Sequence, residues 1–212
     1  MTLRGKYLKL RAFGAYSTGV QTGSPTTEDE FADSLAARLA HHLRPHQVGR
    51  KKALLYDLSF DANGRVAMGV DPDTGDPIRG HGKGFEQDIL VFDEAGDGHT
   101  SVVPRIVGEV KFGSVTTHDV LVYSEKADRI RRVYPYLRYG FVLGGMKHIP
   151  GRVLRLGQRF DFIAAIPSPL SDEGIANFAA LMKEEAAASV RLCELLFGKE
   201  KPALFRRSLI VQ

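Results

Sequence analysis

Residues 85–92 read Phe-Glu-Gln-Asp-Ile-Leu-Val-Phe, and residues 105–112 read Arg-Ile-Val-Gly-Glu-Val-Lys-Phe. Both are short apolar runs separated by a polar turn, which is typical of two β-strands joined as a hairpin. Side chains alternate between the two faces of a strand, so Glu109 and Lys111 project from the same face. If the two strands pair, the carboxylate of Asp88 lies on the same face, beside Glu109 and Lys111.

Two carboxylates and an ammonium group in this arrangement suit a divalent cation with a hydrolytic water beside it. A structural interpretation is also available, because an isolated Glu-x-Lys on a strand is usually an exposed ion pair that contributes less than ~1 kcal/mol. The residues around Asp88 and Glu109 are apolar, however, and predict a covered strand. Charges buried in such a strand need a reason, so we favour a functional role for Asp88, Glu109 and Lys111.

The composition bounds the class of protein. With 212 residues the chain is long enough for a single domain, 1–212, and 43% hydrophobic residues suffice for an ordinary core. The net charge of +4 is compatible with a polyanionic partner without identifying one. A lone Cys193 excludes an internal disulfide framework and a cysteine-based zinc site. Neither a membrane-spanning apolar run nor a secretory signal is present in the sequence, so we expect a cytoplasmic protein with no membrane partner.

A helix is predicted before the hairpin. Thr27 and Glu30 form a capping-box pattern at its start, and Pro45 follows its end. Glu28 lies three residues before the first buried position and extends the inward face of the helix. The buried positions recur at a spacing of four residues: Phe31, Leu35, Leu39 and Leu43.

Between this helix and the hairpin, an apolar stretch at 53–60 predicts a strand, and Asn63-Gly64 predicts a hairpin turn. The basic residues at 50–52 lead into that strand. They are either a solvated strand entry or a phosphate contact, and the sequence leaves both open.

After the hairpin, Thr116 and Thr117 are suitable caps for a helix that extends to about Val133. Asp119 and Tyr123 lie four residues apart on that helix. The remaining elements are predicted as strands at 139–145 and 160–166, a long helix at 172–197, and a terminal strand at 203–211.

The order helix, strand, Asp-bearing strand, Glu-x-Lys strand, helix, strand resembles the PD-(D/E)xK nuclease superfamily over about residues 27–145. The resemblance implies an α/β fold: a central mixed β-sheet flanked by helices, with a restriction-endonuclease-like core (αβββαβ). Residues 146–212 would then be a C-terminal helical extension. One departure is Gln87, which precedes Asp88 where the family pattern has Pro. The Asp119/Tyr123 pair is a weak parallel to the Gln-x-x-x-Tyr feature of some members.

The resemblance also implies a function: metal-dependent hydrolysis of phosphodiester bonds in DNA. Asp88, Glu109 and the carbonyl of Val110 would hold Mg²⁺, for which Mn²⁺ can substitute. Lys111 would orient or help deprotonate a water and stabilise the transition state, and Glu28 would be the additional helix carboxylate. A homodimer is expected if both strands of a duplex are cut, because each chain carries one site, and the helix at 172–197 is a candidate for its interface.

Several roles stay open at this stage. Glu86 shares a strand face with Asp88 and is a candidate second ligand, while His118 is a surface residue, a proton shuttle or a phosphate contact. The basic residues Lys126, Arg129, Arg131 and Arg132 form either a solvated helix face or a track for a nucleic-acid backbone.

Two other functions compete with the nuclease. One is a catalytically silent nuclease-fold subunit that binds nucleic acid or acts in assembly. The other is a metal-independent interaction module, in which the charges are surface residues. The intact set of Asp88, Glu109 and Lys111 favours the enzyme.

Overall fold

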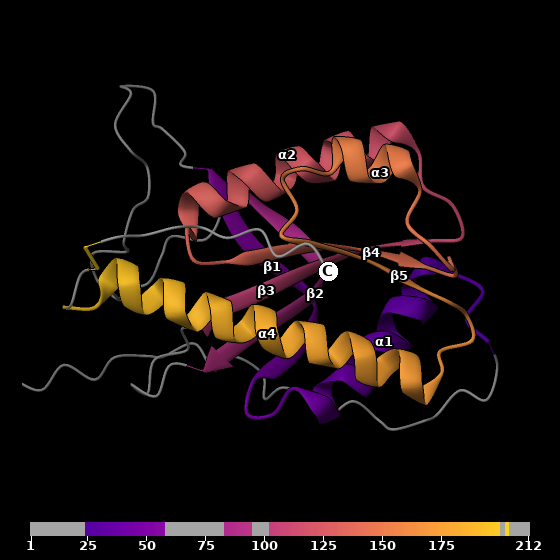
Figure 1. The fold of residues 1–212 in the computed structure, drawn as a ribbon, viewed down its shortest axis with the longest axis horizontal. Helices are drawn as coiled ribbons and strands as arrows, with labels where there is room; N and C mark the ends of the chain where they lie inside the picture. The colour runs from indigo at the N-terminus through magenta and orange to yellow at the C-terminus, as the bar shows by residue number, and fades with distance from the viewer. Residues whose placement is uncertain (1–23, 58–82, 95–101, 200–201, 204–212) are drawn as a thin grey trace, which may run out of the picture.

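A five-stranded mixed β-sheet forms the centre of the computed structural model, which describes residues 24–57, 83–94, 102–199 and 202–203 (Figure 1). The elements follow the chain in this order: α1 (Glu28–His42), β1 (Gln47–Asp57), β2 (Lys83–Glu94), β3 (Val102–Phe112), α2 (Thr117–Val133), β4 (Arg138–Gly144), α3 (Gly151–Leu156), β5 (Phe162–Ile166) and α4 (Asp172–Phe197). The expected α/β class and the mixed central sheet flanked by helices are confirmed.

The strands lie in sequence order, β1-β2-β3-β4-β5. β1, β2 and β3 pair antiparallel, whereas β3, β4 and β5 run parallel. In the predicted hairpin, Ile89 lies opposite Gly108 and Leu90 opposite Val107. One step further along this register, Asp88 faces Glu109, so the two side chains share one face of the sheet.

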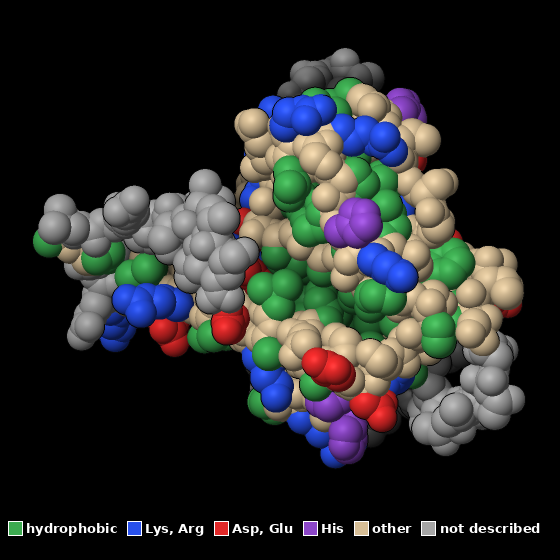
Figure 2. All heavy atoms as spheres, turned by 45° about the vertical axis from the view of Figure 1, so that its right-hand side comes forward, with side chains coloured by type: hydrophobic (Ala, Val, Ile, Leu, Met, Phe, Trp, Pro, Cys, Tyr) green, Lys and Arg blue, Asp and Glu red, His purple; other side chains and the backbone are tan. Residues whose placement is uncertain are grey.

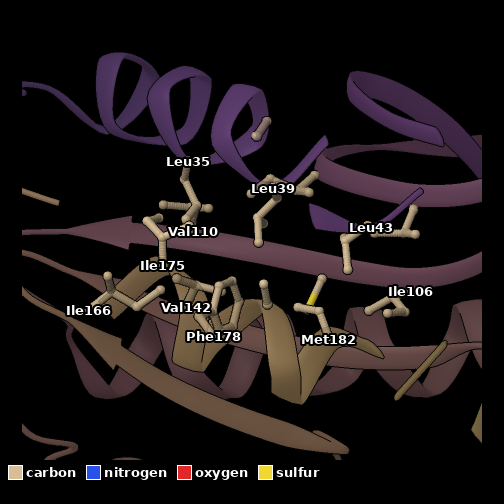
Figure 3. Packing of buried hydrophobic residues seen from close by; sticks show 14 of the residues in the cluster. Leu35, Leu39, Leu43, Ile106, Val110, Val142, Ile166, Ile175, Phe178 and Met182 are labelled. Carbon is tan, nitrogen blue, oxygen red and sulfur yellow. The ribbon is translucent and has the colours of Figure 1, made fainter. Parts of the chain in front are cut away.

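Helices cover both faces of the sheet: α1 and α4 lie on one side, α2 and α3 on the other (Figure 1). Leu35 and Leu39 of α1, with Leu43 just after it, point toward the sheet, where they meet side chains of β3 and of α4 (Figure 3). The opposite side has its own apolar cluster, formed by α2, α3 and the other faces of the strands. A hydrophobic core therefore packs on each face of β3.

The helix starts follow from local chemistry. Thr27 caps α1, and its side chain accepts from the backbone N–H of Glu30 while the Glu30 carboxylate accepts from the N–H of Thr27. Thr116 and Asp119 form the same reciprocal pair at the start of α2. Each box satisfies backbone donors that the first turn leaves unpaired, so both predicted starts are confirmed to within a residue.

Two features differ from the sequence-based expectation. β1 begins at Gln47, so the basic residues at 50–52 lie inside the strand rather than before it. The short helix α3 was not expected, because six residues are too few to display helical periodicity. In addition, the predicted C-terminal helical extension is not purely helical: residues 146–199 contribute β5 to the central sheet as well as α4 to the cover of one face.

Three predictions lie wholly or largely outside the described residues: the Asn63-Gly64 hairpin turn, the polar turn between the two central strands, and the terminal strand at 203–211, of which only residue 203 is described. Among the described helices, none is long and apolar enough to cross a membrane.

Candidate active site

Asp88 of β2 and Glu109 of β3 meet on the side of the sheet that α2 covers. The side chain of Asp88 is 28% exposed, whereas Glu109 is buried at 2%. The register of β2 and β3 places them opposite each other, and the charge of Asp88 acts to raise the pKa of Glu109. The predicted pair is therefore assembled, with one member open to solvent and the other beneath it.

Asp88 is anchored through one of its two oxygens. Oδ2 accepts a hydrogen bond from the backbone N–H of Val110 at 2.8 Å. Oδ1 lies 3.9 Å from the guanidinium of Arg50, which also donates to the backbone carbonyl of Asp88. The orientation of the carboxylate is thus fixed by the strand next to it.

Glu109 is also anchored through one oxygen. Its Oε1 accepts from Nζ of Lys126 at 2.7 Å and from the hydroxyl of Tyr139 at 3.0 Å. Burial, together with the charge of Asp88, raises the pKa of Glu109 to about 7 despite the opposing charge of Lys126. A cation bound beside Glu109 would favour its ionised form.

Lys111 and Glu28 form a second pair at the end of β3. Nζ of Lys111 lies 3.2 Å from Oε2 of Glu28, which also accepts from the backbone N–H of Phe112 at 3.4 Å. Burial lowers the pKa of Lys111, but interactions with Tyr123 and Glu28 outweigh it and leave that pKa raised. Lys111 is therefore an ammonium group at neutral pH. Glu28 contacts Lys111, as an inward-facing residue at the start of α1 can.

Tyr123 of α2 lies among these residues. Its ring centroid is 5.7 Å from Nζ of Lys111 and 5.8 Å from Nζ of Lys126. Burial raises the pKa of Tyr123 to about 12, and the charges of the predicted site residues all act on it. The phenol keeps its proton at neutral pH and is a neutral hydrogen-bond donor within the site.

A three-ligand metal cluster does not form here. Within residues 24–57, 83–94, 102–199 and 202–203, no group of three or more Asp, Glu, His or Cys side chains could hold a metal ion. The donor chemistry nevertheless fits a cation that keeps water ligands. Among the described contacts, the hydrogen bonds to the carboxylates of Asp88 and Glu109 use Oδ2 and Oε1. Oδ1 has an ion pair with Arg50 at 3.9 Å, longer than a hydrogen bond, so Oδ1 and Oε2 are the oxygens that a cation would use. Mg²⁺ takes oxygen ligands and commonly keeps several waters beside one or two carboxylates.

The other candidates from the sequence lie as follows. The side chain of Glu86 is exposed, and its backbone carbonyl accepts from Lys126 at 2.7 Å. His118 is exposed in the first turn of α2. Val110, between Glu109 and Lys111, buries its side chain in the core under α1.

The basic residues of α2 have carboxylate partners. Lys126 is bound to Glu109, and the other pairs are Arg129–Glu125 at 2.9 Å, Arg131–Asp161 at 3.2 Å and Arg132–Asp128 at 2.6 Å. On the face drawn in Figure 2, Lys and Arg side chains form separate groups around a hollow lined by hydrophobic side chains. The charge on this face is distributed in patches, in keeping with a net charge of only +4.

Arg50 lies beside the site, in a place that the sequence did not indicate. Its side chain is 3% exposed and is held between Asp29 at 3.0 Å and Asp33 at 2.7 Å, both on α1. Neither a solvated strand entry nor a phosphate contact describes this residue, because a buried cation with partners is a structural clamp. The available signal was the spacing of Asp29 and Asp33, which places both on one face of the helix.

Lys51 departs from ordinary strand geometry beside the site. Its φ of 51° lies in the left-handed region, which residues other than glycine seldom adopt. Arg50 pairs with Ile89 and Lys52 with Gln87, so Lys51 sits at the position across from Asp88. Its Nζ lies 3.1 Å from Asp29, and half of the side chain is exposed. Unlike Arg50, Lys51 is accessible to a substrate.

Comparison with known proteins does not supply a family. No family model matches the chain, and no curated protein matches it significantly. A functional proposal therefore rests on the residues described above.

Proposed function

We propose that this chain is a metal-dependent nuclease that hydrolyses phosphodiester bonds in DNA, built on a restriction-endonuclease-like core. One observation carries the proposal: Asp88 and Glu109 are neighbours on one face of the hairpin, and each is anchored through a single oxygen. Preorganised carboxylates of this kind are typical of metal sites in which neighbouring groups orient the ligands.

Asp88 and Glu109 would hold the cation, Mg²⁺ or Mn²⁺, with the Val110 carbonyl as a further candidate ligand. Bound there, the ion would neutralise charge on the scissile phosphate and lower the pKa of an attacking water. Asp88 is the accessible ligand, and Glu109 supports it from the interior. The two roles follow from the different exposure of the two carboxylates.

Lys111 has a defined role in such a site. Phosphodiester hydrolysis develops negative charge, and an ammonium group stabilises that charge and donates hydrogen bonds to a water. Because the pKa of Lys111 is raised, its side chain is an ammonium group that donates hydrogen bonds. In this protonated form it does not accept the proton of the attacking water. Glu28 holds its Nζ near the end of β3, and Tyr123 adds a neutral donor close by.

The test is cleavage of supercoiled plasmid and of single-stranded DNA with Mg²⁺, Mn²⁺ or EDTA. We expect cleavage that needs the metal, is lost in Asp88→Asn, and falls about 100-fold in Lys111→Ala, the effect of losing one transition-state donor. Lys183→Ala is the matched control, because that lysine is exposed on α4, across the sheet from α2 (Figure 1). Cleavage in EDTA, or unchanged cleavage in Lys111→Ala, would contradict the proposal.

A second candidate is a catalytically silent subunit of the same fold that binds nucleic acid or acts in assembly. The burial of Glu109, together with its contacts to Lys126 and Tyr139, favours it. DNA binding in a mobility-shift assay, without cleavage under any metal condition, would select this candidate.

A homodimer would allow both strands of a duplex to be cut. α4 buries Phe178 and Met182 against its own sheet, and Phe197 at its end is 66% exposed. Light scattering during size-exclusion chromatography measures the oligomeric state, and a monomer would restrict the enzyme to single-strand cuts in each binding event.

A further inference from the structure

We propose that Lys126 and Tyr139 are positioning residues that fix Oε1 of Glu109 and so keep its second oxygen available to a divalent cation beside Asp88. Neither residue belongs to the Asp…Glu-x-Lys pattern. The inference rests on the proposed function only in that Asp88 and Glu109 form a metal site, and it can be tested without nucleic acid.

Tyr139 is held rigidly. It is fully buried on β4, which pairs with β3 so that Tyr139 lies beside Val107, two residues before Glu109. Its backbone N–H donates to Asp161 at 2.7 Å, and its ring stacks on Phe160 with centroids 6.3 Å apart. The hydroxyl is thereby held where it donates to Oε1 of Glu109 at 3.0 Å.

Lys126 is held from three directions. Its side chain is 11% exposed, and Nζ donates to Oε1 of Glu109 and to the backbone carbonyl of Glu86, each at 2.7 Å. Nζ also lies 5.3 Å from the ring centroid of Phe85, within cation–π range. A lysine bound in this way connects α2 to β2 and β3 and is not a freely moving phosphate contact.

The two donors converge on one oxygen, and this is what gives them a positioning role. Two hydrogen bonds to Oε1 from different elements fix the rotation of the Glu109 carboxylate. Val110 does the same for Asp88 through Oδ2. Mg²⁺ requires near-ideal geometry at about 2.0–2.1 Å, so ligands already in place bind it more tightly than ligands that must be ordered.

Charge and geometry can be separated at this pair. Removing Lys126 takes away a positive charge as well as a hydrogen bond, so its effect on cation binding combines two opposing changes. Tyr139 is neutral, and Tyr139→Phe removes only the hydroxyl. That variant separates loss of the hydrogen bond from loss of a positive charge.

The experiment is a Mn²⁺ titration of the DNA-free protein, followed by electron paramagnetic resonance of unbound Mn²⁺. We expect Tyr139→Phe to weaken Mn²⁺ binding about 10-fold, the lower end of the effect of losing a ligand's hydrogen-bond partner. Lys126→Arg keeps the positive charge and can restore the bond to Oε1, so it should bind Mn²⁺ as the wild type does. The controls Tyr136→Phe and Arg132→Met should stay within about twofold of wild type, because neither residue contacts Glu109.

A second measurement distinguishes weaker cation binding from a general loss of structure. For cleavage, the Mg²⁺ concentration at half-maximal rate should rise about 10-fold in Tyr139→Phe while the rate at saturating Mg²⁺ stays within about threefold. Wild-type affinity for Mn²⁺ in Tyr139→Phe would overturn the inference, as would a wild-type chain that binds no Mn²⁺. If the protein binds Mn²⁺ tightly in a way that depends on Tyr139 but cleaves no DNA, the inference holds and the proposed nuclease function is wrong.

Discussion

The two faces of β3 are packed on different principles. Toward α1 and α4, Ile106 and Val110 are fully buried among apolar side chains. Toward α2, Val107 is also buried, but the next residue on that face is Glu109, which carries a carboxylate into the interior. A buried carboxylate is costly even when it is hydrogen-bonded, and an apolar residue of similar size is often at least as stable. The first face stabilises the fold, and the second gives up stability at a position suited to chemistry.

The largest effect should come from the apolar face. Leu39→Ala removes a fully buried side chain between α1 and the sheet and should lower the free energy of unfolding by about 2–5 kcal/mol. Urea unfolding measures it, with Leu121→Ala as control because that side chain is half exposed on α2. Equal losses in the two variants would mean that α1 does not pack as described.

The polar face should make the stability of the protein depend on pH. Because the pKa of Glu109 is about 7 when folded and 4.5 when exposed, the folded state binds the extra proton between these values. Glu109 therefore contributes most to the free energy of unfolding below pH 4.5. As the pH rises to about 7, this contribution falls by up to about 3 kcal/mol.

Comparing urea unfolding of wild type and Glu109→Gln at pH 5 and pH 8 isolates this contribution. The variant should lose less stability than wild type over that interval, since glutamine does not titrate. Identical losses would indicate that Glu109 is solvated, and the contrast between the two faces would disappear.

A smaller effect is expected at the clamp that joins α1 to β1 and β2. Arg50→Met removes the buried guanidinium and should cost about 1–3 kcal/mol, less than a fully buried pair because Asp29 and Asp33 remain largely exposed. Lys51→Met, a neighbouring charge with half its side chain in solvent, should cost less by the same urea measurement. The reverse order would contradict the clamp.

Local patterns predicted much of this molecule. The stripe from Phe31 to Leu43, the capping residues Thr27 and Thr116, and the pairing of the Asp88 and Glu109 strands follow from periodicity and hydrogen-bonding chemistry within short segments. These interactions are decided by residues close in sequence, or by a register that the apolar pattern fixes.

The partners of Glu109 could not be predicted in the same way. Lys126 and Tyr139 come from α2 and β4, and whether they reach one carboxylate depends on how a helix and a parallel strand pack on the hairpin. Lys126 appeared in the sequence as one of several basic residues on a helix. Likewise, the charges at 50–52 concealed the start of β1, because a buried arginine and an exposed one look alike without their carboxylate partners.

The most direct test of the account is the position of a bound cation. A crystal of the protein soaked in Mn²⁺ should give an anomalous difference peak between Oδ1 of Asp88 and Oε2 of Glu109, with Tyr139 and Lys126 still bonded to Oε1. No peak at that position in the metal-soaked crystal, or a peak bound by other residues in a protein that cleaves DNA, would contradict it.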